Sequence, residues 1–235
     1  MSCIPHHMQC NTPTSFAALL FDMDGLMIDT ESLSANAWRD AASILGVPLP
    51  QIHIDAMVGL AMPLCLNYLI TALGDEAQAR ELENLSRQRY HHALHQQDIP
   101  LKPGITQLLN WCVQQQIPRA VGTATQRQLA DIKLGRTGLA RYFEHSIAGD
   151  EVARTKPAPD VYLQAAARLQ VAPENCIVLE DSCYGAQAAL AANMRVVVVP
   201  DLQQPSAEIA KQALAVCQDL FAATTLLQQL LNLPR

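Results

Sequence analysis

The chain has 235 residues, of which 50% are apolar and 16% are charged, and its formal net charge at pH 7 is −6. This length and apolar content suffice to bury the core of one domain together with a smaller inserted one, and they exclude a largely disordered chain. The acidic balance, with no block of Lys or Arg, argues against a nucleic-acid-binding surface.

Residues 1–15 contain no Lys or Arg, and the apolar run that follows them ends at Asp22. We therefore expect a loosely held tail, with neither a signal peptide nor a membrane-spanning segment. Seven scattered cysteines without CxxC spacing are typical of reduced thiols. Together these features predict a cytoplasmic protein that has no membrane partner.

The first element is an apolar strand over residues 17–21, and the chain has helical character from about residue 31 to residue 99. No strand-like run interrupts this helical block, so we expect it to be an inserted helical domain. A proline-rich stretch, 100–104, is expected to be the hinge at which the chain returns. The apolar spacing predicts helices over 32–45, 63–73 and 77–95. The expected domains are 16–30 with 100–235 as the core and 31–99 as the insertion.

Helical and strand patterns alternate from Pro103 onward. Repeated βα units of this kind predict an α/β fold with a doubly wound parallel sheet, similar to a Rossmann domain. The pattern leaves the order of the strands open. The expected helices are 105–115, 127–136, 160–169 and 184–192, and the expected strands are 119–122, 143–148, 176–179 and 195–199.

Two carboxylates follow the first strand, Asp22 and Asp24, and Gly25 comes directly after them. Ligands bind beyond the carboxyl ends of the strands in open parallel sheets, so both side chains would face a substrate or a metal. An ionised Asp can attack phosphorus or an activated carbon, and a second carboxylate can donate and accept a proton. Because two adjacent carboxylates repel each other, a divalent cation is expected, and all-oxygen ligation favours Mg²⁺ over zinc.

Three later motifs point to the same edge of the sheet. Thr123 and Ala124 follow a strand and offer a hydroxyl and backbone N–H groups near a helix start, where an anionic oxygen is favoured. Lys156 stands directly before two closely spaced prolines and would neutralise charge on a transferring phosphoryl group. Glu180 and Asp181 end another apolar strand and could complete the metal site that the first motif opens.

These four motifs, in this order, resemble those of the haloacid dehalogenase superfamily of phosphotransferases, and the resemblance covers about residues 17–200. It implies that Asp22 is the nucleophile that forms an aspartyl phosphate, and that Asp24 is the general acid and base. It also implies that the helical insertion is a cap that opens and closes over the site, with Gly25 and the residues after it as the flexing connection. The implied phosphate-binding residues are Thr123, Ala124 and Lys156, and the implied Mg²⁺ ligands are Asp22, Asp24 through its carbonyl, Asp181 and its neighbour Glu180.

The chain resembles the branch of this superfamily that holds β-phosphoglucomutase and sugar-phosphate phosphatases. The shared phrases are Phe-Asp-Met-Asp-Gly-Leu-Met-Ile-Asp-Thr-Glu, Lys-Pro-Ala-Pro-Asp and Leu-Glu-Asp-Ser. Dehalogenases lack the second acid of the first motif, so Asp24 favours P–O chemistry over C–halogen chemistry. Ungapped alignment with the mutase places Ser34 where that enzyme has a histidine, and Met62 where it has an arginine that grips the second phosphate.

Without that guanidinium, a distal phosphate loses its bidentate clamp, and water competes for the aspartyl phosphate. We therefore expect Mg²⁺-dependent hydrolysis of a small phosphomonoester, in particular a sugar phosphate. The alternatives are a mutase-type isomerase and a non-catalytic binding module, and the intact motifs disfavour the latter.

Overall fold

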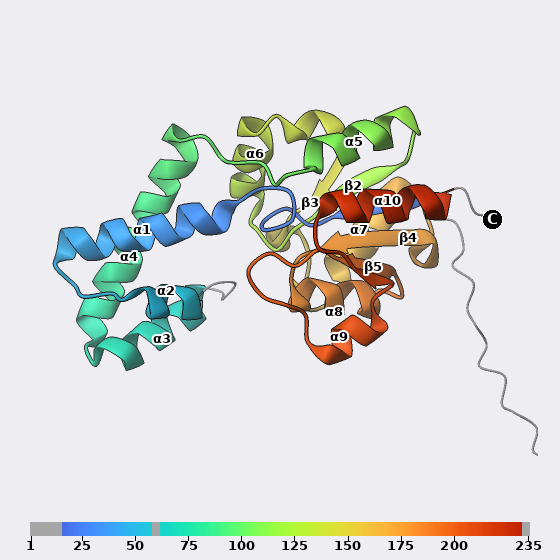
Figure 1. Ribbon diagram of the computed structural model, residues 1–235. Coiled ribbons are helices and arrows are strands. Elements are labelled where there is room, and N and C mark those ends of the chain that lie inside the picture. Colours follow the sequence, from blue (N-terminus) through green and yellow to red (C-terminus); the bar gives the residue numbers. More distant parts are fainter. Residues whose placement is uncertain (1–15, 58–61, 232–235) are drawn as a thin grey trace, which may run out of the picture.

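The computed structural model describes residues 16–57 and 62–231, and the described residues form one six-stranded sheet (Figure 1). All neighbouring strands run parallel, in the order β3-β2-β1-β4-β5-β6. This confirms the predicted α/β fold with a doubly wound parallel sheet. The tail expected over 1–15 lies outside the described residues. The strands are β1 (Ala18–Phe21), β2 (Arg119–Gly122), β3 (His145–Ile147), β4 (Cys176–Glu180), β5 (Arg195–Val198) and β6 (Ala215–Val216).

Most helices lie where the apolar spacing predicted them. The structure adds α2, α9, β6 and α10, which the sequence patterns do not indicate; α2, α9 and β6 are short, and α9, β6 and α10 all lie beyond the last predicted strand. The helices are α1 (Thr30–Leu45), α2 (Gln51–Met57), α3 (Met62–Leu73), α4 (Glu76–Gln96), α5 (Ile105–Gln114), α6 (Arg127–Arg136), α7 (Asp160–Leu169), α8 (Cys183–Ala191), α9 (Ala207–Gln212) and α10 (Leu220–Leu231).

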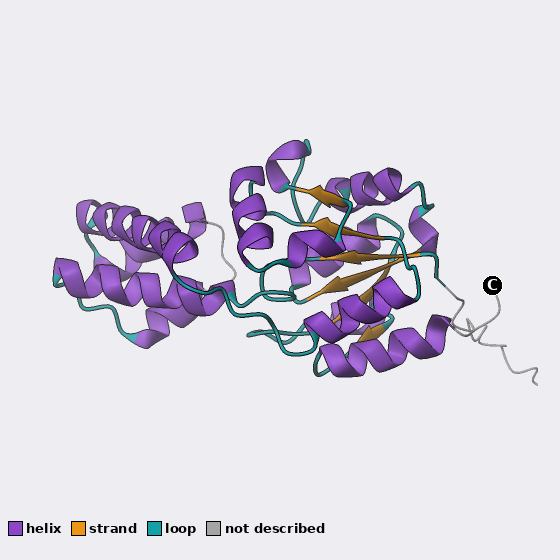
Figure 2. Ribbon diagram, turned by 90° about the horizontal axis from the view of Figure 1, so that it is seen from above, coloured by secondary structure: helices purple, strands orange, loops and turns teal. Residues whose placement is uncertain are grey.

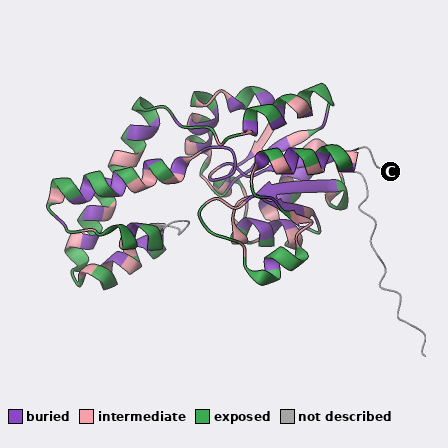
Figure 3. Cartoon of the chain, in the orientation of Figure 1, coloured by how far each residue is buried: buried purple, intermediate pink, exposed green. Residues whose placement is uncertain are grey.

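Helices cover both faces of the sheet (Figure 2). Successive side chains of a strand point to opposite faces, so β1 contributes Leu19 and Phe21 to one cluster and Ala18 and Leu20 to the other. The first cluster is completed by α5, α6 and α10, and the second by α7, α8 and α9. Both faces of the central strands are therefore buried, as Figure 3 shows, and polar groups are expected only where the strands end.

Helices α1 to α4 form a separate body inserted after β1, with a cluster of its own around Trp38. In Figure 1 the β4 arrow points toward this body. The body therefore lies beside the edge of the sheet where the parallel strands end. Helix α1 begins after the N-cap Asp29, whose side chain accepts a hydrogen bond from the Ser32 N–H, and it ends at Gly46 in a left-handed conformation. The helical insertion therefore faces the edge that carries the motifs.

The two segments that join this body to the sheet domain pair with each other. Ile28 and Leu101 form an antiparallel bridge, and the Asp29 N–H donates to the Pro100 carbonyl at 2.9 Å. Residues 26–28 are buried in the core of the sheet domain. A flexing connection formed by Gly25 and the residues after it stays a prediction. Within the described residues, every helix is too short or too polar to span a bilayer.

Candidate active site

Asp22 stands directly after β1, at the centre of the sheet. Its N–H donates to the Leu179 carbonyl of β4 at 3.0 Å, which keeps the two strand ends together. Gly25 has a φ of +83°, and a Cβ placed on it would lie 2.1 Å from Oδ2 of Asp181. Only glycine therefore allows the loop after β1 to pack against Asp181, and this contact brings the first and fourth motifs together.

Lys156 connects two of the acidic side chains. Its ammonium donates to Oδ1 of Asp22 and, at 2.7 Å, to Oε1 of Glu180, and its side chain is only 6% exposed. The ring of Tyr162 on α7 lies 4.7 Å from the ammonium. The lysine of the third motif is thus a buried cation beside the first acid, as its expected role requires.

Glu180 is completely buried and accepts hydrogen bonds on both oxygens. Oε1 accepts from Lys156 and from the Tyr162 hydroxyl at 2.7 Å, and Oε2 accepts from the N–H of Asp181 at 3.0 Å and from Ser182. Its carboxylate lies against Gly185 of α8, where a Cβ would come within 1.6 Å of Oε1. This environment indicates that Glu180 holds Lys156 in place, and the Tyr162 contact was not evident from the sequence.

Asp24 accepts hydrogen bonds from three different parts of the described chain. Thr30 donates to its Oδ1 at 2.7 Å, Thr125 donates to its Oδ2 at 2.7 Å, and Lys133 donates to its Oδ1 at 2.6 Å. Burial would raise the pKa of Asp24, but the Lys133 ammonium and the two hydroxyls outweigh it and lower that pKa. Lys133 was missed by the motif analysis, because a lysine within α6 reads as an ordinary surface residue.

Thr123 lies at the end of β2 and is 1% exposed. Its hydroxyl oxygen accepts the Thr125 N–H at 3.1 Å, and its own N–H donates to the Ile147 carbonyl. A Cβ on Gly149 would lie 2.2 Å from the Ala124 carbonyl oxygen, so the loop after β3 packs tightly against this turn. The structure places Thr123 and Ala124 at the same edge as Asp22, and their binding of phosphate stays a prediction.

Burial raises the pKa values of two acids at this edge, Asp22 and Asp181. It raises the pKa of Asp22 to about 7, where Lys156 lowers it and Glu180 and Asp24 raise it further. Burial also raises the pKa of Asp181 well above its ordinary value, and Glu180 and Asp22 act in the same direction. The site therefore concentrates more negative charge than one lysine neutralises.

Three of the acids fit a hard cation. Asp22, Glu180 and Asp181 each offer an oxygen, and these oxygens lie within 4.8 Å of one another. Carboxylate oxygens are the ligands that Mg²⁺ prefers, and a divalent ion would relieve the crowding of charge that raises the pKa values of Asp22 and Asp181. The residues therefore suit the ion that the motifs predict.

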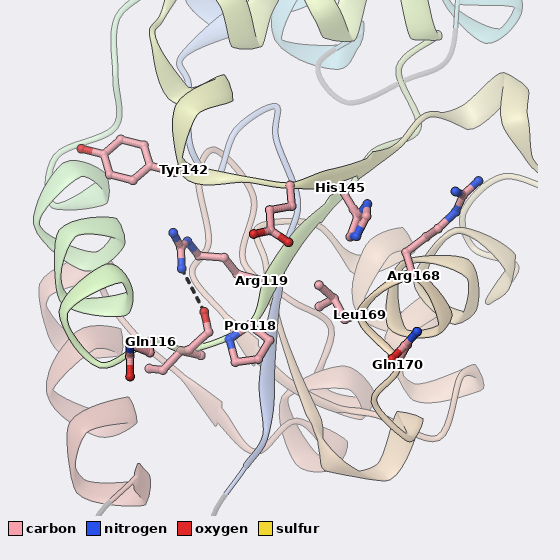
Figure 4. A pocket seen from close by; sticks show the side chains of 10 residues that line it. Gln116, Pro118, Arg119, Tyr142, His145, Arg168, Leu169 and Gln170 are labelled. Carbon is pink, nitrogen blue, oxygen red and sulfur yellow. Dashed lines mark hydrogen bonds between the residues drawn. The ribbon is translucent and has the colours of Figure 1, made fainter.

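A cavity of about 490 Å³ lies at the opposite end of the sheet (Figure 4). Arg119 at the start of β2, His145 at the start of β3 and Arg168 in the last turn of α7 line it. Arg119 donates to the Ile117 carbonyl at 2.9 Å, so it also closes the end of the preceding segment. Because the strands begin here and end at Asp22, this cavity is separate from the acidic site.

The chain is similar in sequence and in structure to known hydrolases and phosphatases. The sequence model of the haloacid dehalogenase-like hydrolases matches residues 19–199. The fructose-1-phosphate phosphatase YqaB of Escherichia coli is 35% identical over 191 residues, which cover 78% of this chain and 96% of that protein. A phosphorylated carbohydrates phosphatase of Thermotoga maritima is 33% identical over 179 residues, covering 75% and 82%. The crystal structure of a hydrolase from Deinococcus radiodurans, with bound phosphate and sodium, has a TM-score of 0.78 at 26% identity, covering 94% and 100%.

Proposed function

Because the chain belongs to the haloacid dehalogenase-like hydrolase family, we propose that it is a Mg²⁺-dependent phosphatase that hydrolyses a sugar phosphate through a covalent aspartyl phosphate. The observation that carries this proposal is the pairing of two different aspartates at the end of β1. Asp22 is buried beside the Lys156 ammonium, whereas Asp24 is held by hydroxyls and a second lysine. This difference between the two environments supports Asp22 as the nucleophile and Asp24 as the acid and base.

In the first step, a carboxylate oxygen of Asp22 attacks phosphorus and the bond between phosphorus and the ester oxygen breaks. Without substrate, the Lys133 ammonium and the two hydroxyls lower the pKa of Asp24. The negative charge of the bound phosphate ester raises it, so Asp24 carries a proton, gives it to the departing alcohol, and the sugar leaves neutral. Lys156, the Thr123 hydroxyl and the Ala124 N–H lie at the same edge and would bind the phosphoryl oxygens, where loose phosphoryl transfer is stabilised most.

In the second step, Asp24 is ionised and takes a proton from a water molecule that attacks the phosphorus of the aspartyl phosphate. The P–O bond to Asp22 breaks, inorganic phosphate leaves, and both acids return to their starting states. Mg²⁺ would be held by Asp22, Asp181 and the Asp24 carbonyl, and when bound it offsets the charge of the phosphoryl oxygens. Glu180 is the less suitable ligand, because both of its oxygens already accept hydrogen bonds.

Two relatives named for phosphorylated carbohydrates support a sugar phosphate as the substrate class. The alternative is a mutase-type phosphotransfer, which must retain a bisphosphate intermediate in the closed site. Ser34 is half-buried on α1 and cannot supply the cationic partner that a histidine would. The side chain of Met62, the other departure from the mutase pattern, lies outside the described residues. We therefore favour hydrolysis.

The test is a panel of phosphomonoesters that includes fructose 1-phosphate, hexitol phosphates and β-glucose 1-phosphate, assayed with Mg²⁺ and with excess chelator. We expect phosphate release from one or more sugar phosphates, dependent on Mg²⁺ and lost in Asp22→Asn. Formation of glucose 6-phosphate faster than phosphate release, dependent on a bisphosphate primer, would instead establish a mutase. Tight substrate binding without any turnover would establish a binding module.

A further inference from the structure

Lys133 is a buried cation that belongs to none of the four motifs. It lies on α6 with 4% of its surface exposed, although lysine is among the residues least often buried. Its ammonium donates to Oδ1 of Asp24 at 2.6 Å and lies 3.4 Å from the Thr125 hydroxyl. Lys133 and Asp24 are 109 positions apart in the sequence, so their contact exists only in the folded chain.

Residues of the sheet domain and of the helical insertion both lie next to Lys133. The ring of Tyr90, on α4 of the helical insertion, lies 5.7 Å from the Lys133 ammonium and packs against the core of the sheet domain. Thr30, the first residue of α1, donates to the same Oδ1 that Lys133 contacts. The lysine therefore lies where α4 and α1 of the insertion approach Asp24.

Stability alone is a poor explanation for such a pair. Burying two ions costs several kcal/mol of desolvation, and apolar side chains of similar volume are often as stable or more so. The arrangement does, however, distinguish the two oxygens of Asp24. Oδ1 accepts hydrogen bonds from the Lys133 ammonium and the Thr30 hydroxyl. Among the described residues, Oδ2 accepts a hydrogen bond from the Thr125 hydroxyl alone.

A threonine hydroxyl can donate to Oδ2 when Asp24 is ionised and accept from it when Asp24 is protonated. An ammonium cannot accept, so Oδ1 is unsuited to carry the proton. We propose that Lys133 is a positioning residue, which fixes the carboxylate of Asp24 and makes Oδ2 the oxygen that gives its proton to the leaving alcohol. This proposal rests on the proposed phosphatase function.

The test uses two esters of similar size, 4-nitrophenyl phosphate and phenyl phosphate, and compares their kcat/KM values. Phenolate is the poorer leaving group and needs the proton, whereas 4-nitrophenolate departs with little help. The parameter kcat/KM reports steps up to departure of the leaving group, so the later base step does not enter it. The readout is the ratio of the two kcat/KM values measured on the same protein preparation. The fraction of folded protein affects both values equally and cancels in this ratio.

In Lys133→Met, we expect kcat/KM for phenyl phosphate to fall about 10- to 100-fold and that for 4-nitrophenyl phosphate to fall less than about threefold, since general acid catalysis contributes about 10²- to 10⁴-fold. Lys133→Arg keeps the cation and should largely restore the ratio. Lys102→Met is the matched control, because it removes another lysine–aspartate pair, with Asp201 at 2.5 Å, neither member of which hydrogen-bonds to Asp24. It should leave the ratio unchanged.

Lys133→Gln serves as a second neutral variant should the methionine variant not accumulate. An equal loss for both esters in the neutral variants, or an unchanged ratio, would overturn the positioning role. A gain in activity toward phenyl phosphate would also overturn it, because Lys133 would then hold Asp24 in an unproductive position. A wild-type protein that releases phosphate from neither ester and from no member of the sugar-phosphate panel would refute the proposed function itself.

Discussion

Replacing Glu180 with glutamine tests whether this residue anchors Lys156. The amide has nearly the same shape as the carboxylate, but one of its two ends is an NH₂ group that only donates. If that end faces Lys156 and the Tyr162 hydroxyl, an NH₂ group takes the position of Oε1 and meets two donors. If it faces Asp181 and Ser182, it meets their N–H groups. Neither orientation satisfies the site.

The expected loss of folding stability follows from the burial of the Glu180–Lys156 ion pair. Removing one partner of a buried ion pair costs roughly 3–5 kcal/mol, and we expect about 3 kcal/mol because Lys156 keeps Asp22 as a second partner. For a chain of this size, that loss lowers Tm by about 6–12 °C. Glu76→Gln is the matched control: it breaks the exposed pair with Arg80, whose side chains are about 60% accessible, and should cost less than about 1 kcal/mol.

The assay is urea unfolding followed by circular dichroism, in excess chelator so that no metal contributes. A loss in Glu180→Gln that does not exceed the loss in Glu76→Gln would refute the anchoring role. If Glu180 acted mainly as a metal ligand, the metal-free variant would keep its stability, and only its affinity for Mg²⁺ would fall.

Three further predictions concern the acids and the metal. Asp22→Asn should abolish turnover while circular dichroism remains native, since the amide keeps the shape but cannot attack phosphorus; substantial residual activity would contradict the covalent mechanism. Asp24→Asn should reduce kcat for a sugar phosphate by roughly 10²- to 10⁴-fold, measured by phosphate release. The raised folded-state pKa of Asp22, about 7, means that this group destabilises the metal-free fold increasingly as pH rises from its ordinary value of 3.8 toward 7. Because Mg²⁺ binds the ionised carboxylates, it should raise Tm more at about pH 8 than at about pH 5.5, and an equal shift at both would contradict a carboxylate site.

The sequence by itself determined the fold class and the edge of the sheet where chemistry occurs. In a parallel sheet both faces of a central strand are buried. The acids that follow an apolar run must therefore lie at the edge where the strand ends. Asp22, Lys156 and Asp181 could therefore be predicted as neighbours from local patterns alone. The apolar spacing over residues 32–45 likewise predicted helix α1, which spans Thr30–Leu45.

Only the tertiary structure decided which groups support these acids. Lys133 contacts Asp24 across 109 positions, and Tyr162 on α7 donates to Glu180 at the end of β4. Such contacts depend on the strand order, which puts β1 between β2 and β4, and on where each helix lies over the sheet. Apolar periodicity reports which face of an element is buried and carries no information about its partner, so a buried lysine within α6 looks the same as a solvated one until the chain is folded.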